Sequence, residues 1–220
     1  MTGHHAGEKI VLASNNAGKV REINQLLASE QITVVPQKDF NIPDAIEDGL
    51  SFVENAIKKA RHAASLSGLA AIADDSGIEV DALSGAPGIY SAHFAGPGAS
   101  DQANLQKLLE RIKDVPDEKR SARFQCLLVY MRHTEDPTPI ICQSTWEGQI
   151  LFEAQGDNGF GYDPIFYVPT HNCSSAELAT EVKNSLSHRG LALRKLLQAL
   201  NLGPPCCTKS IGRKSESLFK

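Results

Sequence analysis

One stretch, residues 71–96, constrains the fold and the function more than any other part of the chain. An apolar run there ends at two adjacent carboxylates, Asp74 and Asp75, and Ser76 and Gly77 follow at once. An apolar run bounded by a Ser-Gly turn signal is typical of a buried strand that ends at that point. Open α/β sheets bind ligands at the carboxyl ends of their strands. The sequence therefore predicts a ligand site at this pair of carboxylates.

The two carboxylates are not expected to share one role. Successive residues of a regular strand point to opposite faces of the sheet, so Asp74 and Asp75 cannot both face one substrate. We expect one of them to act at the site and the other to hold the turn. For the bare DDSG motif an ordinary solvated turn is an open alternative. An EF-hand calcium loop does not fit, because its D-x-D-x-D-G spacing is missing.

A second candidate site follows the first expected strand, at the small polar loop Ser14–Lys19. A helix with apolar residues at three- and four-residue spacing comes next. A strand, a polar loop and a helix in this order point backbone N–H groups and a helix N-terminus at an anion. The loop lacks the spacing of a P-loop, so by itself it indicates phosphate binding only weakly.

Two later segments carry residue types suited to a planar ligand. Phe160 is flanked by glycines in the stretch 156–164, GDNGFGYDP, and glycines let a backbone and a ring approach a ligand closely. A tight turn with a core phenylalanine is the alternative. Further on, Ser187 is expected to cap a helix and to place His188 and Arg189 in its first turn. Cations there oppose the helix dipole, which favours a ligand role.

Hydrophobic spacing and capping signals predict the other elements. Strands are expected at residues 9–14, 32–35, 122–132 and 139–150. Helices are expected after the loop Ser14–Lys19, from Ser51 to about Leu66, from Ser100 to near Pro116, and after Ser187.

The string ADDSGIEVDALSGAPGIYSAHFAG closely resembles the central signature of the inosine/xanthosine triphosphate pyrophosphatase family, which removes non-standard purine nucleotides. The resemblance extends over roughly residues 10–200, and includes Ser14–Lys19 (the family's S/T-x-N-x-x-K triphosphate loop), GFGYDP and Ser187–Arg189. It implies an α/β fold with a mixed central β-sheet, flanking helices, and two lobes with the active-site cleft between them. The implied reaction is attack at the α-phosphorus of the nucleotide, which gives a nucleoside monophosphate and pyrophosphate.

The resemblance also implies the residues of the site. Asp75 is implied as the catalytic residue, with Glu47 and Asp75 as ligands of a Mg²⁺ ion. Phe160 is implied as the ring that stacks on the base, and His188 and Arg189 as the base-recognition residues. The other implied substrate-binding residues are Ser14, Asn15, Asn16, Ala17, Gly18, Lys19, Lys59, Ser76, Gly161, Tyr162, Asp163 and Lys183.

The mixture of charges favours an enzyme over a passive nucleotide-binding protein. A triphosphate carries about four negative charges, which Lys19, Lys59 and Lys183 would partly offset. Carboxylates among these lysines would repel the substrate unless they held a metal. Mg²⁺ prefers one or two carboxylates together with phosphate oxygens and water. Asp75 is then the best candidate to accept the proton of the attacking water.

Base selectivity has a physical account. Hypoxanthine and xanthine carry an acceptor at O6, to which Arg189 and His188 could donate, whereas adenine carries an amino donor and would leave buried groups unpaired. Rejection of guanine must come from its 2-amino group, and no residue is assigned to that task. Two other functions stay open: a pyrophosphatase for another modified nucleotide, such as a damaged pyrimidine, and a non-catalytic nucleotide-binding protein.

Length and composition set the remaining expectations. The 220 residues and 23.8 kDa suit a polar leader at 1–8, a single two-lobed domain at 9–202 and a flexible tail at 203–220. A net charge of −4 argues against a nucleic-acid partner. No stretch approaches the roughly 18 apolar residues of a membrane span, so we expect a cytoplasmic protein without a membrane partner.

Two expectations concern assembly and the thiols. The family is typically homodimeric, so the resemblance implies a homodimer. The five cysteines form no C-x-x-C pair, and no disulfide is expected. Cys126 and Cys142 lie in apolar runs and are expected to be buried.

Overall fold

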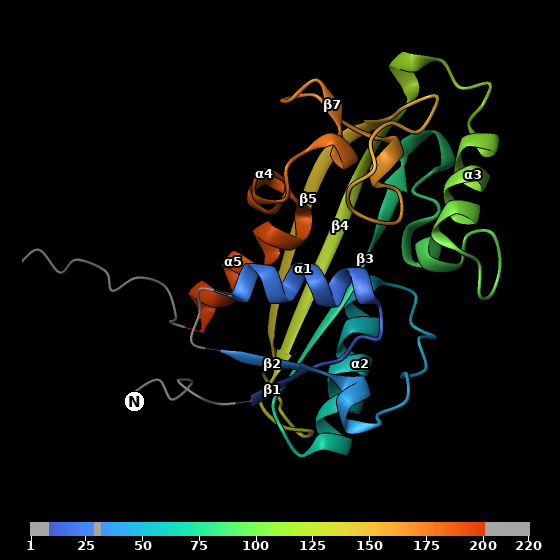
Figure 1. The fold of residues 1–220 in the computed structure, drawn as a ribbon. Coiled ribbons are helices and arrows are strands. Elements are labelled where there is room, and N and C mark those ends of the chain that lie inside the picture. The colour runs from blue at the N-terminus through green and yellow to red at the C-terminus, as the bar shows by residue number, and fades with distance from the viewer. Residues whose placement is uncertain (1–8, 29–31, 201–220) are drawn as a thin grey trace, which may run out of the picture.

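The computed structural model describes residues 9–28 and 32–200, and these residues form one seven-stranded mixed sheet (Figure 1). The strand order is β2-β1-β3-β4-β5-β6-β7. β1 is parallel to β2 and β3, and every later pair is antiparallel. The strands are β1 Lys9–Leu12, β2 Thr33–Pro36, β3 Ala71–Val80, β4 Ser121–Met131, β5 Ile140–Ile150, β6 Phe166–Val168 and β7 Cys173–Ser174. The mixed sheet with flanking helices confirms the predicted fold class.

Of the five α-helices in the described residues, all but α4 begin at a capping side chain. The five helices are α1 Ala17–Leu27, α2 Phe52–Ser67, α3 Asp101–Arg111, α4 Thr180–Leu186 and α5 His188–Ala199. The side chains of Ser51, Ser100 and Ser187 each accept a hydrogen bond from a first-turn backbone N–H, as predicted. α3 ends at Arg111, earlier than the predicted end near Pro116. The Ile112 and Val115 carbonyls there accept hydrogen bonds from the buried guanidinium of Arg120.

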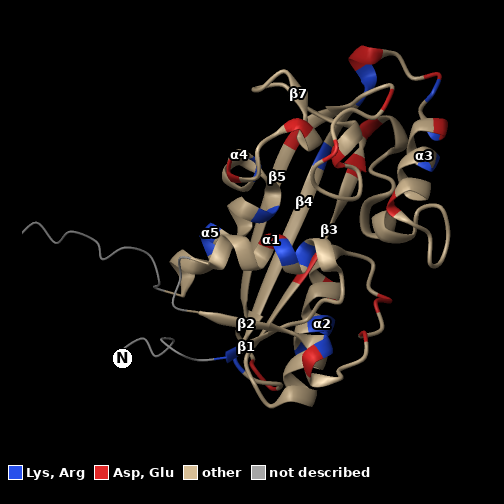
Figure 2. Cartoon of the chain, viewed as in Figure 1, with Lys and Arg blue, Asp and Glu red and all other residues tan. Residues whose placement is uncertain are grey.

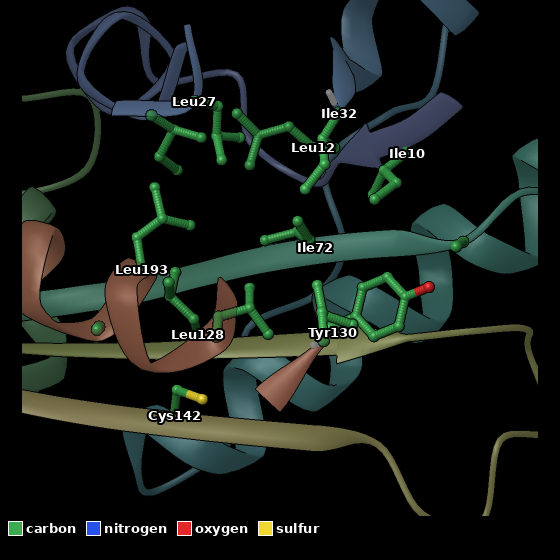
Figure 3. Close-up of a cluster of buried hydrophobic side chains, with 14 of the residues drawn as sticks. Ile10, Leu12, Leu27, Ile32, Ile72, Leu128, Tyr130, Cys142 and Leu193 are labelled. Carbon is green, nitrogen blue, oxygen red and sulfur yellow. The ribbon is translucent and has the colours of Figure 1, made fainter. Parts of the chain in front are cut away.

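The part of the sheet around β1 is covered on both faces. α1 and α5 pack on one face through a cluster that includes Leu12, Leu27, Ile72, Leu128 and Leu193 (Figure 3). α2 packs on the opposite face, where its small residues, among them Ala56, Ala60 and Ala63, meet the other side of β1, β3 and β4. Small side chains on α2 allow its backbone to lie close to the sheet, which places its polar residues near β3.

The far half of the long strands has a separate core. Ile78 on β3 and Phe124 on β4 pack there with Leu105 and Leu108 of α3 and with Phe166 of β6. The two halves explain why β3, β4 and β5 are long, because each strand serves both cores. The division into leader, domain and tail stays a prediction, and residues 1–8 and 203–220 lie outside the described residues. In the described part of the chain, no helix is long and apolar enough to cross a membrane.

The strand that carries the two carboxylates does not end at Ser-Gly, which corrects the sequence-based expectation. β3 continues to Val80, and Ser76 and Gly77 pair with Cys126 and Gln125 of β4. Gly77 marks a close backbone approach instead of a turn: a Cβ atom there would lie 2.3 Å from the carbonyl oxygen of Gly88. The 3₁₀ segment η3, Gly88–His93, packs against β3 at this point. Asp74 consequently holds no turn.

Candidate active site

A cleft of about 650 Å³ lies at the middle of β3, between the two halves of the molecule. Its volume is within the usual range for small-molecule sites. The cleft is lined by the predicted residues Ser14, Asn15, Asn16, Lys19, Glu47, Lys59, Asp75, Ser76, Phe160, Gly161, Tyr162, Asp163, Lys183, His188 and Arg189. Ala17 and Gly18 are the two predicted site residues outside this lining. Segments far apart in sequence therefore meet here, and in Figure 2 the ribbon carries both basic (blue) and acidic (red) positions where α1 faces β3.

On the α2 side of the sheet, two carboxylates converge on one ammonium group. Lys59 Nζ donates to Asp75 Oδ1 at 2.6 Å and to Glu47 Oε2 at 3.1 Å. Burial raises the pKa of Asp75, and the nearby Lys59 and Lys19 ammonium groups offset this only in part. A carboxyl group that is desolvated and beside a cation in this way is the kind of group that accepts a proton or a metal ion.

On the α5 side, Asp74 is the centre of a buried ion cluster. Lys19 Nζ lies 2.8 Å from Asp74 Oδ1, and Arg189 Nε lies 2.8 Å from Asp74 Oδ2. Burial favours the neutral carboxyl group, but Arg189 and Lys19 outweigh it and hold the pKa of Asp74 well below its usual value. Ser76 completes the cluster by donating to Asp74 and accepting from Arg189. Asp74 and Asp75 therefore have different partners on the two faces of the sheet, and of the two only Asp75 lines the cleft.

The cluster continues to a third carboxylate, Glu22 of α1. Glu22 accepts hydrogen bonds from Arg189 and, at 2.6 Å, from Lys183 Nζ. Lys183 also donates to Asp163 Oδ2 at 2.7 Å. Burial raises the pKa of Glu22, but the two cations outweigh it and the net shift is downward. The structure thus places Lys183 with Arg189 and Asp163, on the other side of the sheet from the Lys59 and Asp75 pair.

The first turn of α5 supplies a neutral ring beside this charge cluster. The His188 imidazole is buried and stacks on Phe124, with ring centroids 4.6 Å apart. Burial and the nearby Arg189 charge lower the pKa of His188 well below its usual value. Its Nδ1 has no hydrogen-bond partner among the described residues. The charge of Arg189, by contrast, is offset by Asp74 and Glu22, which removes the conflict with the helix dipole.

Phe160 lies at the same end of the cleft. Its ring centroid is 5.5 Å from Lys183 Nζ and 5.6 Å from Arg189 Cζ. Glycines with positive φ flank it, 80° at Gly159 and 63° at Gly161. The cleft therefore has one end built from an aromatic ring and buried cations, and another end built from Lys59, Asp75 and Glu47.

The family model described as the Ham1 family matches residues 10–199. The chain belongs to the Ham1 family. This membership confirms the resemblance seen in the sequence.

Relatives of this Ham1-family chain match it over nearly their whole length. A protein named dITP/XTP pyrophosphatase from Vibrio cholerae is 60% identical over 199 residues, which are 90% of this chain and 100% of that protein. Another of the same name, from Shigella flexneri, is 59% identical over 89% of this chain and 100% of that protein. The solved structure of a HAM1 protein from Coxiella burnetii has a TM-score of 0.81 at 49% identity, covering 88% of this chain and 98% of that one. A dITP/XTP pyrophosphatase structure from Mycobacterium abscessus has a TM-score of 0.68 at 40% identity, covering 86% and 98%.

The buried ion cluster of this Ham1-family chain has no motif or spacing that predicts it from the sequence. Glu22 was assigned no role, although its carboxylate contacts two of the predicted site cations. Its only signal was its position beside Ile23, at the edge of the apolar face of α1. One carboxylate of the Asp74 and Asp75 pair was expected to hold a turn, whereas Asp74 pairs with Lys19 and Arg189 and Asp75 with Lys59.

Acid is expected to destabilise this Ham1-family fold, beginning below the ordinary pKa of histidine, about 6.5. The pKa of His188 is lowered by burial, and those of Asp74 and Glu22 are lowered by their cations despite burial. The folded state then binds fewer protons than the unfolded state, so stability is present at neutral pH and is lost as pH falls. The raised pKa of Asp75 makes stability increase as pH falls, but this is one group against the three whose pKa values are lowered.

Urea unfolding at a series of pH values from 7 to 3 measures this dependence. We expect the free energy of unfolding to fall steadily over that range, most steeply below about pH 4.5, where carboxyl groups of the unfolded chain take up protons. A free energy that stayed constant or rose between pH 5 and pH 3 would contradict the expectation.

Proposed function

We propose that this chain is a Mg²⁺-dependent hydrolase that converts the non-standard purine nucleotides ITP, dITP and XTP to the monophosphate and pyrophosphate. The names of the relatives from Vibrio cholerae and Shigella flexneri support this substrate class. One observation carries the proposal: a single cleft joins Asp75, Glu47 and Lys59 to Phe160, Lys183 and Arg189. Its two ends suit a triphosphate and a planar base respectively.

The donor set of the cleft fits a hard divalent cation. Four cationic side chains there form ion pairs with five carboxylates, so the protein alone offers no surplus of positive charge to a triphosphate. Glu47 and Asp75 would hold the ion, because both already converge on one cation, Lys59 Nζ. When bound, Mg²⁺ neutralises charge on the phosphates and makes a bound water more acidic.

The side chains at the phosphate end bind the triphosphate and activate the attacking water. Lys19 and Lys59 contact phosphate oxygens through charge-assisted hydrogen bonds. Asp75, whose pKa is raised by burial, accepts the proton of the attacking water. The water oxygen bonds to the α-phosphorus, the bond from that phosphorus to the bridging oxygen breaks, and pyrophosphate leaves with the electron pair.

The side chains at the other end bind the base. Phe160 stacks on the purine, and the buried donors around it favour a base that accepts at O6. Lys183 belongs to this end because its Nζ lies 5.5 Å from the Phe160 ring, although the family pattern suggested a phosphate ligand. Adenine would place an amino donor against these cations. Two donors cannot pair, so both would be left without a hydrogen bond, which disfavours adenine.

A substrate panel tests the proposed function. Purified protein is incubated with Mg²⁺ and with inosine, xanthosine, adenosine, guanosine and modified pyrimidine triphosphates, and pyrophosphate and orthophosphate are measured separately. We expect pyrophosphate from the inosine and xanthosine nucleotides, and a loss of turnover when EDTA removes the metal. Faster turnover of a modified pyrimidine would favour the alternative house-cleaning enzyme. Nucleotide binding without turnover in any sample would favour a non-catalytic binding protein.

Lys59→Ala is expected to weaken triphosphate binding more than monophosphate binding, because it removes a charge-assisted contact to the phosphates. Lys19→Ala should behave in the same way. Lys58 provides a matched control, since it is the neighbouring residue on α2 and pairs with the exposed Asp48. Calorimetry with ITP and IMP on each variant gives the comparison. An equal loss for both ligands, or the same loss in Lys58→Ala, would place Lys59 outside the phosphate site.

We also propose that the enzyme is a cytoplasmic homodimer. Ile141 of β5 is 46% exposed and Phe152, just after β5, is 59% exposed. Homodimer interfaces are more apolar than the rest of a protein surface, and aromatic residues such as Phe152 are enriched in them. Light scattering on the purified protein should give a mass near twice 23.8 kDa. A mass equal to one chain at micromolar concentration would rule the homodimer out.

A further inference from the structure

The ring of Phe160 lies directly on the first turn of α1. A Cβ atom built at Gly18 would lie 2.6 Å from Cγ of Phe160 and 2.7 Å from its Cδ1. Real Cβ atoms do not approach other atoms so closely, so no other residue fits at position 18 while the ring keeps this place. Gly18 is the second residue of α1, and the close approach of Phe160 explains why this position carries no side chain.

Two carboxylates hold the backbone on either side of the ring. The N–H of Phe160 donates to Asp163 Oδ2 at 2.8 Å, and the N–H of Gly161 donates to Asp101 Oδ2 at 2.9 Å. Asp101 is the first residue of α3, 60 positions before Gly161 in the sequence, and it also lines the cleft. Gly161 has a φ of 63°, a left-handed conformation that glycine adopts about as readily as others, and its hydrogen bond to Asp101 favours this one.

We propose that Gly18 and Asp101 are positioning residues that fix the ring of Phe160 before the substrate arrives. The inference rests on the proposed function, in which this ring stacks on the purine. Holding a binding group in its bound conformation removes an ordering cost from association. The two residues should therefore act on KM through Phe160, and leave kcat, which depends on the Asp75 end of the cleft, nearly unchanged.

A double-mutant cycle tests the role of Gly18. Gly18→Ala forces the ring to move and should raise KM for inosine triphosphate by roughly tenfold, an ordinary size for residues in direct contact. In the Phe160→Ala background no ring is present, so adding Gly18→Ala should change KM by less than about twofold. A rise in KM by the same factor in both backgrounds would overturn the proposal, because the effect would not pass through Phe160. A fall in kcat that matched the KM effect would overturn it too.

Asp101 offers a test that does not depend on turnover. Asp101→Ala removes the acceptor of the Gly161 N–H, whereas Asp101→Asn keeps an oxygen acceptor of the same shape. Hydrogen exchange at the Gly161 amide should become faster in Asp101→Ala and should be largely restored in Asp101→Asn. KM for inosine triphosphate should rise in the alanine variant and return toward the wild-type value in the asparagine variant.

The outcomes separate this inference from the proposed function. Unchanged exchange in Asp101→Ala would overturn the positioning role of Asp101, and faster exchange with an unchanged KM would overturn its connection to substrate binding. If the wild-type protein hydrolysed no inosine triphosphate, the proposed function would fail. Hydrogen exchange at the Gly161 amide and nucleotide affinity would still decide whether Asp101 fixes the Phe160 ring.

Discussion

Asp75→Asn is expected to lower kcat by about 10²–10⁴-fold, the usual cost of losing a general base. The change removes the group that accepts the proton of the attacking water and one of the two carboxylates proposed for Mg²⁺. The protein should stay folded, because asparagine has the same shape and its side-chain oxygen can still accept from Lys59 Nζ, now 2.6 Å from Asp75. The measurement is kcat with inosine triphosphate at saturating Mg²⁺, together with a thermal unfolding curve.

A matched control lies a few residues further along the chain. Asp81 directly follows β3, outside the cleft, where hydrogen bonds from Arg123 and Ser121 lower its pKa to about 2. Asp81→Asn makes the same chemical change and should leave kcat at the wild-type value. If Asp75→Asn kept more than half of the wild-type rate, Asp75 would be neither the base nor an essential metal ligand, and the proposed mechanism would fail.

Local signals explain the parts of the fold that the sequence predicted well. Ser187 caps the start of α5, where this helix was expected to begin. Gly68, which is left-handed with a φ of 69°, ends α2 close to its expected end. Each signal needs only the few residues around it. The two long strands β4 and β5 were also placed within about two residues, because their apolar content and the Pro-containing turn between them are local features as well.

Contacts between distant residues explain the parts that could not be predicted. β3 passes through Ser76 and Gly77 because β4, about 50 positions later, supplies a ladder partner for each of them. Turn propensity alone therefore gave the wrong end for this strand. Glu22 lies 161 and 167 positions from Lys183 and Arg189, and no periodicity or motif spacing covers such a separation.

Lys183 shows why spatial neighbours are needed to refine a role that a motif implies. A motif assigns a residue to a site, but the end of the site that a residue serves depends on its neighbours in space. Lys183 pairs with Glu22 and Asp163 and lies over the Phe160 ring, which is the reason we propose it for the base end, and the phosphate role that the motif implies stays a prediction.

The largest effect on stability is expected one residue before Asp75. Asp74→Asn keeps the shape of the side chain but removes the charge that Arg189 and Lys19 face inside the protein. The side chains of Arg189 and Asp74 are 3% and 0% exposed, so solvent cannot replace the lost partner. Removing one member of a buried pair typically costs about 3–5 kcal/mol. Urea unfolding at pH 7 should show a loss of that size.

Asp75→Asn is the matched control for this prediction, since the same substitution is made at the next residue of the same strand. Burial favours the neutral form of Asp75 and raises its pKa, whereas the cations around Asp74 hold its pKa well below the usual value. A neutral side chain is therefore tolerated better at Asp75 than at Asp74, and Asp74→Asn should lose clearly more stability. The difference in the free energy of unfolding between wild type and Asp74→Asn should become smaller as pH falls, because the wild-type protein then loses the same ionised carboxylate. Equal losses in the two variants at pH 7 would show that Asp74 does not hold the cluster together.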